Sequence, residues 1–323
     1  MRALVIGHFS TVGDIESLEY VRSVLVGEGI AYDVLPYNVK YAPFIDGALD
    51  LSAVEPSNYT HLIAVCGPLW PEFLAKHGFA LGPFAHCTRI GLNLTMVRPL
   101  DEWNPFHLLI ERDSDRASRP DITFLQQTGH VPVAGLCTIA RQREYGEKQR
   151  HAEAIALMRD AIRRRNLAPV EIDTRWPERR NSGGLDSPEQ VLSVMAKMDV
   201  VFTNRLHGMV YALKAGTPAL AIDPVAGGDK VSAQAAVLGW PAVATVEADS
   251  PEWLERTLDW CLSQEGRNAA QAVAARTREK LQPASDEFRE ALHKRFDDHP
   301  LPPEPRPSFA RRVRRLFAGK RRI

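Results

Sequence analysis

The sequence predicts an α/β fold made of two successive domains, each with a parallel sheet between helices. The composition, the length and the alternation of short apolar runs with amphipathic segments predict this. The chain has 323 residues, of which 45% are hydrophobic, 25% charged and 8% aromatic, and this composition argues against disordered, collagen-like and coiled-coil proteins. At roughly 150 residues per domain, the length favours two domains.

The first half of the chain begins with a strand, a loop and a helix. Residues 2–7 form a continuous apolar run, which is typical of a parallel strand covered on both faces. Residues 7–13 are then a loop, and Asp14 can cap the helix that follows. The apolar face of that helix is expected at Ile15, Leu18, Val21 and Leu25. Further strands are expected at residues 31–35, 61–66, 89–92 and 107–110.

A second α/β cycle begins with the apolar run at residues 131–137. A helix follows, with apolar positions at Ala154, Ile155, Met158 and Ile162. Strands are expected at 169–172, 200–203, 219–222 and 242–245, and helices at 188–198, 207–215, 229–238, 251–263 and 271–294. We expect a flexible loop within residues 166–187. The predicted domains are 1–138 and 139–299, with a separate tail at 300–323.

The cysteines and the apolar runs indicate the cellular compartment in which we expect the protein. Four cysteines lie far apart without C-x-x-C spacing, at positions 66, 87, 137 and 261. This predicts reduced, buried thiols and no structural metal. No run approaches the roughly 20 apolar residues that cross a bilayer, and residues 1–7 are too short for a secretory signal. We therefore expect a cytoplasmic protein.

The formal net charge of zero conceals a basic tail. Residues 301–323 contain eight Lys and Arg residues and one acid, or +7, which leaves −7 on residues 1–300. After a proline-rich spacer, apolar side chains recur at helical spacing between arginines, at Phe309, Val313, Leu316 and Phe317. This predicts a basic amphipathic helix that binds an anionic membrane surface. A disordered tail or a nucleic-acid-binding tail are the alternatives, and we favour the membrane.

The segment 199–223 carries the strongest functional signal. The expected strand ends at Asn204 and a helix begins near Leu206, so Arg205 and His207 lie at the carboxyl edge of the sheet beside free N–H groups. Arg205 offers a planar fork of donors to phosphate or carboxylate, and an imidazole exchanges protons near neutral pH. The alternative is an ordinary ion pair and a structural histidine.

This segment resembles the C-terminal signature of the polysaccharide pyruvyltransferase family. The resemblance rests on Arg-Leu-His-Gly at 205–208, Gly-Thr-Pro at 216–218 and the strand that follows. Lys230-Val231 and Leu238-Gly239 resemble the family's lysine and its following helix. The upstream match is thinner and is limited to Gly13-Asp14 and Arg112-Asp113.

The resemblance implies a GT-B-like fold, in which two Rossmann-like domains face a cleft. It places the acceptor side on residues 1–138 and the donor side on residues 139–299. It also implies transfer of a pyruvyl group from phosphoenolpyruvate to a sugar of an exopolysaccharide or its lipid-linked precursor, as a ketal, with release of phosphate. Phosphoenolpyruvate is a co-substrate, and no cofactor, metal or nucleic acid is expected. A GT-B glycosyltransferase, a sugar-nucleotide epimerase and a non-catalytic carbohydrate-binding or scaffold relative are the alternatives.

The same resemblance assigns roles to individual residues. The expected donor contacts are Asn204, Arg205, Leu206, Gly208 and Lys230. His207 is the expected general acid, and Asp14 is either the base or only a helix cap. Arg112 and Trp176 are the expected acceptor contacts, against a surface ion pair for the first and simple loop packing for the second.

Overall fold

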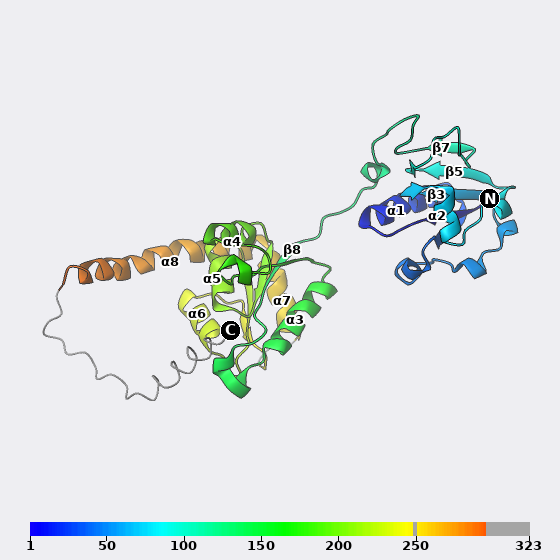
Figure 1. Cartoon of the computed structure of the whole chain (residues 1–323). Coiled ribbons are helices and arrows are strands. Elements are labelled where there is room, and N and C mark those ends of the chain that lie inside the picture. The colour runs from blue at the N-terminus through cyan, green and yellow to red at the C-terminus, as the bar shows by residue number, and fades with distance from the viewer. Residues whose placement is uncertain (248–250, 295–323) are drawn as a thin grey trace, which may run out of the picture. The chain divides into compact units, whose positions relative to one another are not determined.

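The computed structural model describes residues 1–247 and 251–294, and the chain divides into two compact units. Unit 1 is Met1–Gly129 and unit 2 begins at His130 (Figure 1). This division falls earlier than the predicted boundary at 138, because strand β8 (Val133–Cys137) pairs with the strands of unit 2. The predicted tail at 300–323 lies outside the described residues.

Unit 1 contains a five-stranded parallel sheet in the order β2-β1-β3-β5-β7. The five strands are β1 (Arg2–Gly7), β2 (Ala31–Pro36), β3 (His61–Val65), β5 (Thr88–Leu92) and β7 (Leu108–Ile110). A separate pair, β4 (Pro68–Leu69) and β6 (Thr95–Met96), is also parallel. Buried apolar clusters lie on both faces of the sheet. The predicted strands are confirmed to within one or two residues.

Helix α1 (Val12–Gly27) follows β1 and begins earlier than predicted. Its N-cap is Thr11, whose hydroxyl accepts the N–H of Asp14. The Asp14 carboxylate accepts the N–H of Thr11 in return, so the two residues form a capping box. The remaining helices of unit 1 are α2 (Pro71–Lys76) and short 3-10 turns at Val39–Phe44, Leu51–Ala53, Pro56–Asn58, Gly82–Phe84 and Ile122–Leu125.

Unit 2 contains a second five-stranded parallel sheet, in the order β12-β11-β10-β8-β9. The strands after β8 are β9 (Ala168–Glu171), β10 (Val200–Thr203), β11 (Ala219–Asp223) and β12 (Val243–Thr245). The core includes fully buried Phe202, Met158 and Met209. These strands confirm the predicted α/β class for the second half.

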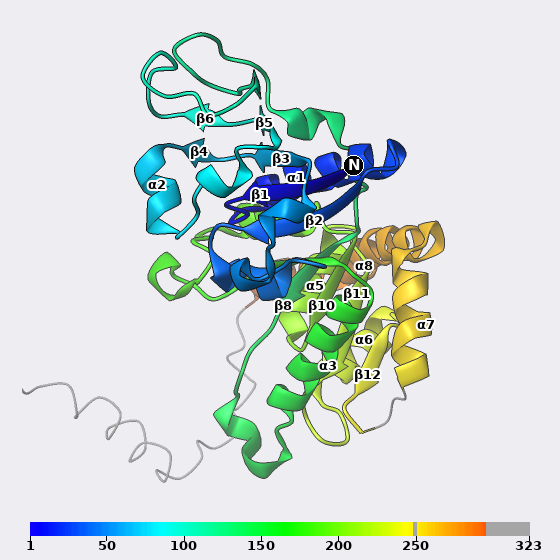
Figure 2. The same cartoon turned by 90° about the vertical axis from the view of Figure 1, so that its right-hand side faces the viewer.

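Helices cover both faces of the second sheet. They are α3 (His151–Arg164), α4 (Pro188–Met195), α5 (Leu206–Lys214), α6 (Lys230–Leu238), α7 (Pro251–Leu262) and α8 (Gln264–Ala291), with 3-10 turns at Arg143–Lys148 and Glu178–Arg180. Figures 1 and 2 show α3 and α7 on one face and α4, α5 and α6 on the other. The closing helix α8 starts earlier than the predicted residue 271.

The two sheets share one topology. In each unit the first strand lies between the second and the third, with the fourth and fifth strands beyond the third. The chain therefore reverses its direction across the sheet beside the first strand, and ligands of open α/β sheets bind at the carboxyl ends of the strands at such a point. In unit 1 this point lies between β1 and β3, and in unit 2 between β8 and β10.

Two predictions about cysteines and membranes can be compared with the structure. All four cysteines are free and buried, as predicted. Within the described part of the chain, no helix is both long and apolar enough to cross a bilayer.

Candidate functional site

Arg205 lies where β10 ends and α5 begins. Its backbone N–H donates to Thr203 Oγ1 at 3.0 Å, and the same hydroxyl donates to the carbonyl of Cys137 on the neighbouring strand β8 at 2.7 Å. Arg205 is the N-cap of α5, and no side chain caps the first turn. The first N–H groups of α5 are therefore available to an anion.

The side chain of Asn204 bonds to the loop after β8. Its side chain is fully buried, with Oδ1 accepting the N–H of Ile139 at 2.8 Å and Nδ2 donating to the carbonyl of Ile139 at 3.0 Å. The predicted donor contact is wrong for this side chain, because it is buried and both of its polar atoms bond to the backbone N–H and C=O of Ile139. Asn204 instead fixes the loop after β8 against the end of β10.

Gly208 is required for packing and not for approach of a ligand. A Cβ atom at this position would lie 2.1 Å from Thr203 Oγ1 and 3.1 Å from Cys137 Sγ. The glycine is buried in the first turn of α5. Its role is to let α5 begin directly above β8 and β10, which corrects the predicted ligand contact.

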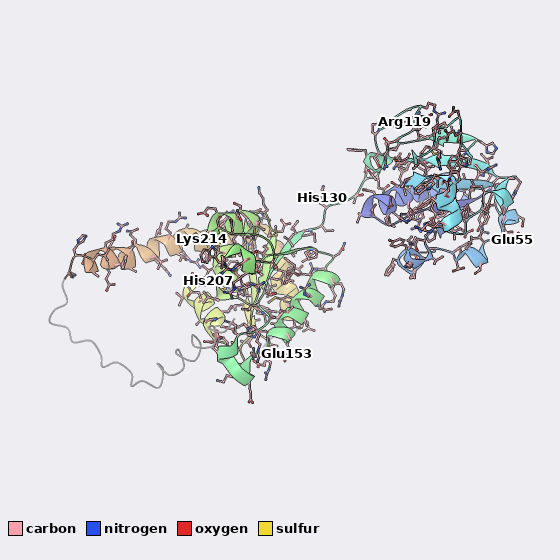
Figure 3. The ribbon with its side chains drawn as sticks, in the orientation of Figure 1. Glu55, Arg119, His130, Glu153, His207 and Lys214 are labelled. Atoms are coloured by element: carbon pink, nitrogen blue, oxygen red, sulfur yellow. The ribbon has the colours of Figure 1, made fainter. Side chains whose placement is uncertain are left out.

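Four residues predicted from the sequence line one small hollow of about 140 Å³ in unit 2. They are Arg205, Leu206, His207 and Lys230, and Ile139 and Gln142 complete the lining. His207 is exposed at the second position of α5, and Figure 3 shows it near the opposite end of that helix from Lys214. Two cationic side chains and an imidazole therefore surround the free N-terminus of α5.

Lys230 reaches this hollow from the start of α6. Its Nζ lies 5.2 Å from the centroid of the Tyr145 ring and 3.9 Å from Glu144 Oε1. The loop before it is held by Asp223, a fully buried carboxylate that accepts the N–H groups of Asp229 at 2.8 Å and Ser232 at 2.9 Å. Sequence analysis did not single out Asp223. Its position at the end of a buried strand was the available signal.

A larger hollow of about 440 Å³ also includes Arg205 and His207. Its other wall is the loop after β9, including Trp176 and Asn181, together with Tyr211 of α5. Trp176 is 73% exposed at this wall. The exposed indole therefore borders the same space as the predicted acid, His207.

The loop that carries Trp176 is held by two buried polar side chains, Asp173 and Asn181. Asp173 accepts hydrogen bonds from the Arg175 guanidinium at 2.7 Å and from the N–H of Ser182 at 2.9 Å. Asn181 donates to the carbonyls of Asp173 and Arg175 at 2.9 and 3.1 Å. Burial alone would raise the pKa of Asp173, but these donors hold it well below its ordinary value.

Asp173 also reaches the central arginine. Its Oδ1 lies 3.7 Å from Arg205 Nη1, so it limits the positions that the Arg205 guanidinium can take. A third hollow, of about 340 Å³, contains Arg159, Arg175 and Arg205 together with Glu171 and Asp173. Arg205 thus borders all three hollows. Sequence analysis missed Asp173, although it lies only two residues after the end of strand β9.

Asp14 belongs to unit 1, and its carboxylate is used by the backbone. Oδ2 accepts the N–H groups of Ser10 at 3.0 Å and Thr11 at 2.9 Å. Burial alone would raise the pKa of Asp14, but these bonds lower it. A carboxylate with a lowered pKa is a weak proton acceptor. The capping alternative is therefore the better description of Asp14.

Arg112, the predicted acceptor contact in unit 1, has each of its terminal groups paired. Nε donates to Asp113 at 2.9 Å, Nη1 to Asp121 at 3.1 Å and Nη2 to Thr95 Oγ1 at 2.7 Å. The guanidinium joins strand β6 to the chain after β7. The ion-pair alternative therefore describes Arg112, and its predicted contact with the acceptor is not supported.

Unit 2 is thus an α/β domain with a hollow lined by cationic side chains at the carboxyl edge of its parallel sheet. Residues 120–224, about a third of the chain, match the model of the family described as Polysaccharide pyruvyl transferase. The predicted family resemblance is confirmed over this segment, and with it the class of enzyme, a transferase. The segment includes Arg205 and His207 but ends before Lys230.

Comparison with curated protein sequences finds no match. Among solved structures, a spinosyn rhamnosyltransferase complexed with spinosyn aglycone is 11% identical, with 91% of this chain and 100% of that chain covered and a TM-score of 0.35. A UDP-GlcNAc 2-epimerase from Methanocaldococcus jannaschii is 9% identical, with coverages of 86% and 99% and a TM-score of 0.29. MurG from Acinetobacter baumannii is 9% identical, with coverages of 86% and 95% and a TM-score of 0.28.

Proposed function

We propose that the protein transfers a pyruvyl group from phosphoenolpyruvate to a saccharide, and that unit 2 binds the donor. One observation carries the proposal: Arg205, His207 and Lys230 surround the free N-terminus of α5 in one hollow. Phosphoenolpyruvate carries a phosphate and a carboxylate, so it needs two cationic or N–H-rich contacts. Arg205 supplies a planar fork, Lys230 a compact charge and α5 a set of N–H groups.

The proposed reaction consists of two hydroxyl additions at C2 of phosphoenolpyruvate, and the proton of each hydroxyl group can be followed. An acceptor hydroxyl forms a C–O bond to C2 of phosphoenolpyruvate while the C2=C3 double bond breaks and C3 takes a proton from His207. A second hydroxyl then bonds to C2, the C2–O bond to phosphate breaks, and the phosphate leaves carrying the second hydroxyl proton. Two hydroxyl protons are thus released, one replacing that of His207 and one leaving on phosphate.

The larger hollow supplies a place for the acceptor ring beside His207. Trp176 presents an exposed indole there, and such faces bind flat apolar surfaces while their edges stay hydrated. The loop beneath Trp176 is fixed by Asp173 and Asn181, so the indole needs little ordering when a ligand binds. We assign Trp176 to contact with the acceptor sugar.

Titration of the full chain with phosphoenolpyruvate and with nucleotide sugars tests the donor. Saturable binding of phosphoenolpyruvate alone supports the proposal. Binding of a nucleotide sugar alone favours a glycosyltransferase or an epimerase, and binding of neither favours a carbohydrate-binding or scaffold protein. Each of the last two results contradicts the proposal.

We also propose that the acceptor belongs to an exopolysaccharide or its lipid-linked precursor, and that the basic tail holds the enzyme on the inner face of the membrane. The support is the sequence of residues 309–317, where apolar and arginine side chains alternate at helical spacing. Deletion of residues 308–323 should abolish sedimentation with anionic vesicles while leaving the unfolding temperature unchanged. Equal sedimentation of the full and shortened chains contradicts this assignment.

A further inference from the structure

We propose that the third hollow of unit 2, which is lined by Arg159, Arg175 and Arg205, binds a phosphate group, and that this phosphate is attached to the acceptor sugar. The acceptor is then a glycosyl phosphate, as in a lipid-linked precursor, and not a finished neutral polysaccharide. This assignment rests on the proposed function. It adds a site that neither the donor nor the sugar ring uses.

The third hollow lies at the carboxyl ends of three neighbouring strands. Thr138 directly follows β8, whereas Asp173 and Arg205 lie two residues after the ends of β9 and β10, and all three residues line the hollow. Strand β8 lies between β9 and β10, so the hollow is at the point where the strand order reverses. Open α/β sheets bind their ligands at such a point. The volume of about 340 Å³ also falls within the usual range for small ligands, about 300–1,000 Å³.

Three guanidinium groups reach this hollow from three different elements. Arg159 belongs to α3, Arg175 to the loop after β9, and Arg205 to the start of α5. The carboxylates of Glu171 and Asp173 also line the hollow, so three positive charges against two negative charges leave one positive charge. A guanidinium group binds phosphate through two parallel hydrogen bonds. The lining therefore favours a phosphate group over a neutral ligand.

Two of these arginines keep N–H groups without an acceptor in the part of the chain that the structure describes. The Arg205 side chain is only 18% exposed, and its guanidinium approaches Asp173 no more closely than 3.7 Å. Arg175 uses Nε and Nη2 to bond to Asp173, which leaves Nη1. Because a guanidinium has five N–H donors, Arg205 can meet the donor and a second anion at the same time.

The third arginine can exchange its present partner at little cost. Arg159 Nη2 donates to Glu171 Oε1, but the two side chains are 57% and 58% exposed. Exposed ion pairs of this kind contribute little to stability. A phosphate dianion offers Arg159 more charge and more acceptor oxygens than a carboxylate does. Arg159 is therefore the contact that a phosphate group gains most easily.

The third hollow and the hollow of about 440 Å³ assigned to the sugar share part of their lining. Arg175 and Arg205 line both, and Arg175 directly precedes Trp176. His207 lines the sugar hollow and the donor hollow but not the third one. A sugar ring that contacts Trp176 therefore has its phosphate toward Arg175 and its reacting hydroxyl groups toward His207.

Paired probes test the site in the absence of phosphoenolpyruvate. They are the methyl glycosides of galactose, glucose, mannose and N-acetylglucosamine and the 1-phosphates of the same sugars, titrated into the full chain and followed by saturation-transfer NMR. For at least one sugar, the 1-phosphate should bind about tenfold more tightly than the methyl glycoside, because it gains charge-assisted hydrogen bonds. Equal affinity within every pair, or binding of no probe, overturns the inference.

Inorganic phosphate is the third probe, because the proposed reaction also releases phosphate. We expect it to bind more weakly than the best 1-phosphate, since it lacks the contact of the sugar ring with Trp176. If inorganic phosphate binds as tightly as every 1-phosphate, the hollow receives the released phosphate, and its assignment to the acceptor is wrong.

Variants of the lining locate the phosphate group. Arg159→Gln should weaken binding of the 1-phosphate about 5- to 10-fold and leave that of the methyl glycoside unchanged, whereas Trp176→Ala should weaken both. Glu171→Gln removes the competing carboxylate and should tighten 1-phosphate binding about 2- to 5-fold. Arg163→Gln is the matched control, because Arg163 is another exposed arginine of α3 with an ion pair of its own. An equal loss in Arg159→Gln and Arg163→Gln contradicts a contact at the third hollow.

Lys230→Gln separates the third hollow from the donor hollow. Lys230 lines only the donor hollow, so this variant should lose affinity for phosphoenolpyruvate and keep its affinity for the 1-phosphate. A 1-phosphate whose binding depends on Lys230 and not on Arg159 occupies the donor hollow, and the proposed site is then wrong. A wild-type protein that does not bind phosphoenolpyruvate contradicts the donor proposal and not the phosphate site.

Discussion

The two units share one strand order, but the carboxyl edges of their sheets carry different side chains. The carboxyl edge of the sheet in unit 2 carries Arg205 and Lys230 beside a free helix N-terminus. The corresponding edge in unit 1 carries His8 and Phe73 instead, and its helix N-terminus is filled by the Thr11–Asp14 capping box. The comparison teaches that one topology can carry a capped helix N-terminus in one unit and an uncapped one in the other, and only the uncapped helix offers free N–H groups to an anion.

The largest expected effect is the loss of the general acid in unit 2. His207→Ala should lower kcat about 10²- to 10⁴-fold, the usual contribution of a general acid, while leaving the Kd of phosphoenolpyruvate nearly unchanged. Steady-state phosphate release and calorimetry measure the two quantities. His293→Ala changes another exposed histidine of unit 2 and serves as the control. Full activity of the His207 variant rules out the assigned acid.

The next largest effect concerns the stability of unit 1 at acid pH. Glu111 of unit 1 is buried and pairs with Arg116 at 2.9 Å and Arg119 at 2.7 Å. The Arg116 guanidinium is the main cause of a pKa lowered to about 2. Because the folded value lies below the unfolded one, this carboxylate stabilises the fold above about pH 4.5 and the stabilisation is lost as the pH falls toward 2.

Glu111→Gln should therefore lower the free energy of unfolding by about 1–3 kcal/mol at pH 7, since two guanidinium groups lose their charged partner. Denaturant unfolding at pH 7 and pH 3 measures this, and the difference between variant and wild type should shrink at the lower pH. Glu102→Gln, an exposed residue of the same unit, should have no effect. A difference independent of pH contradicts the role of the charge.

Packing beneath the donor site provides a third test. Gly208→Ala should destabilise unit 2 by about 1–3 kcal/mol, because the added methyl group overlaps Thr203 Oγ1. Thermal unfolding followed by circular dichroism measures the effect. Gly27→Ala in unit 1 has nothing within 4 Å of the added atom and should be neutral. Equal unfolding temperatures for the two variants contradict the packing role of Gly208.

The smallest expected effect concerns the acceptor. Trp176→Ala should raise the acceptor KM about 3- to 10-fold, roughly the value of one aromatic contact, with the Kd of phosphoenolpyruvate unchanged. Kinetics at saturating donor measure the change. Phe124→Ala removes another exposed ring, in unit 1, and should leave KM unchanged. An effect confined to donor affinity would place Trp176 at the wrong substrate.

Local patterns were sufficient to predict the strands and the main cations. Apolar runs such as 200–203 fix strands because both faces of a parallel sheet are buried, and Arg205, His207 and Lys230 follow from strand and helix ends. The pattern places Asp173 and Asp223 near strand ends, but it could not reveal their partners or those of Asn181, because these lie in loops whose course is set by side-chain hydrogen bonds. Likewise, the apolar pattern does not show that strand β8 belongs to the second domain and not to the first.

Calorimetric titration of phosphoenolpyruvate into the wild type, Arg205→Lys and His8→Asn tests the division of labour most directly. We predict saturable binding to the wild type, unchanged binding to His8→Asn, and about 10- to 100-fold weaker binding to Arg205→Lys, where the bidentate fork is lost. Arg163→Lys, at an exposed position on α3, should match the wild type. Affinity that is insensitive to Arg205, or that is lost with His8, would contradict the account.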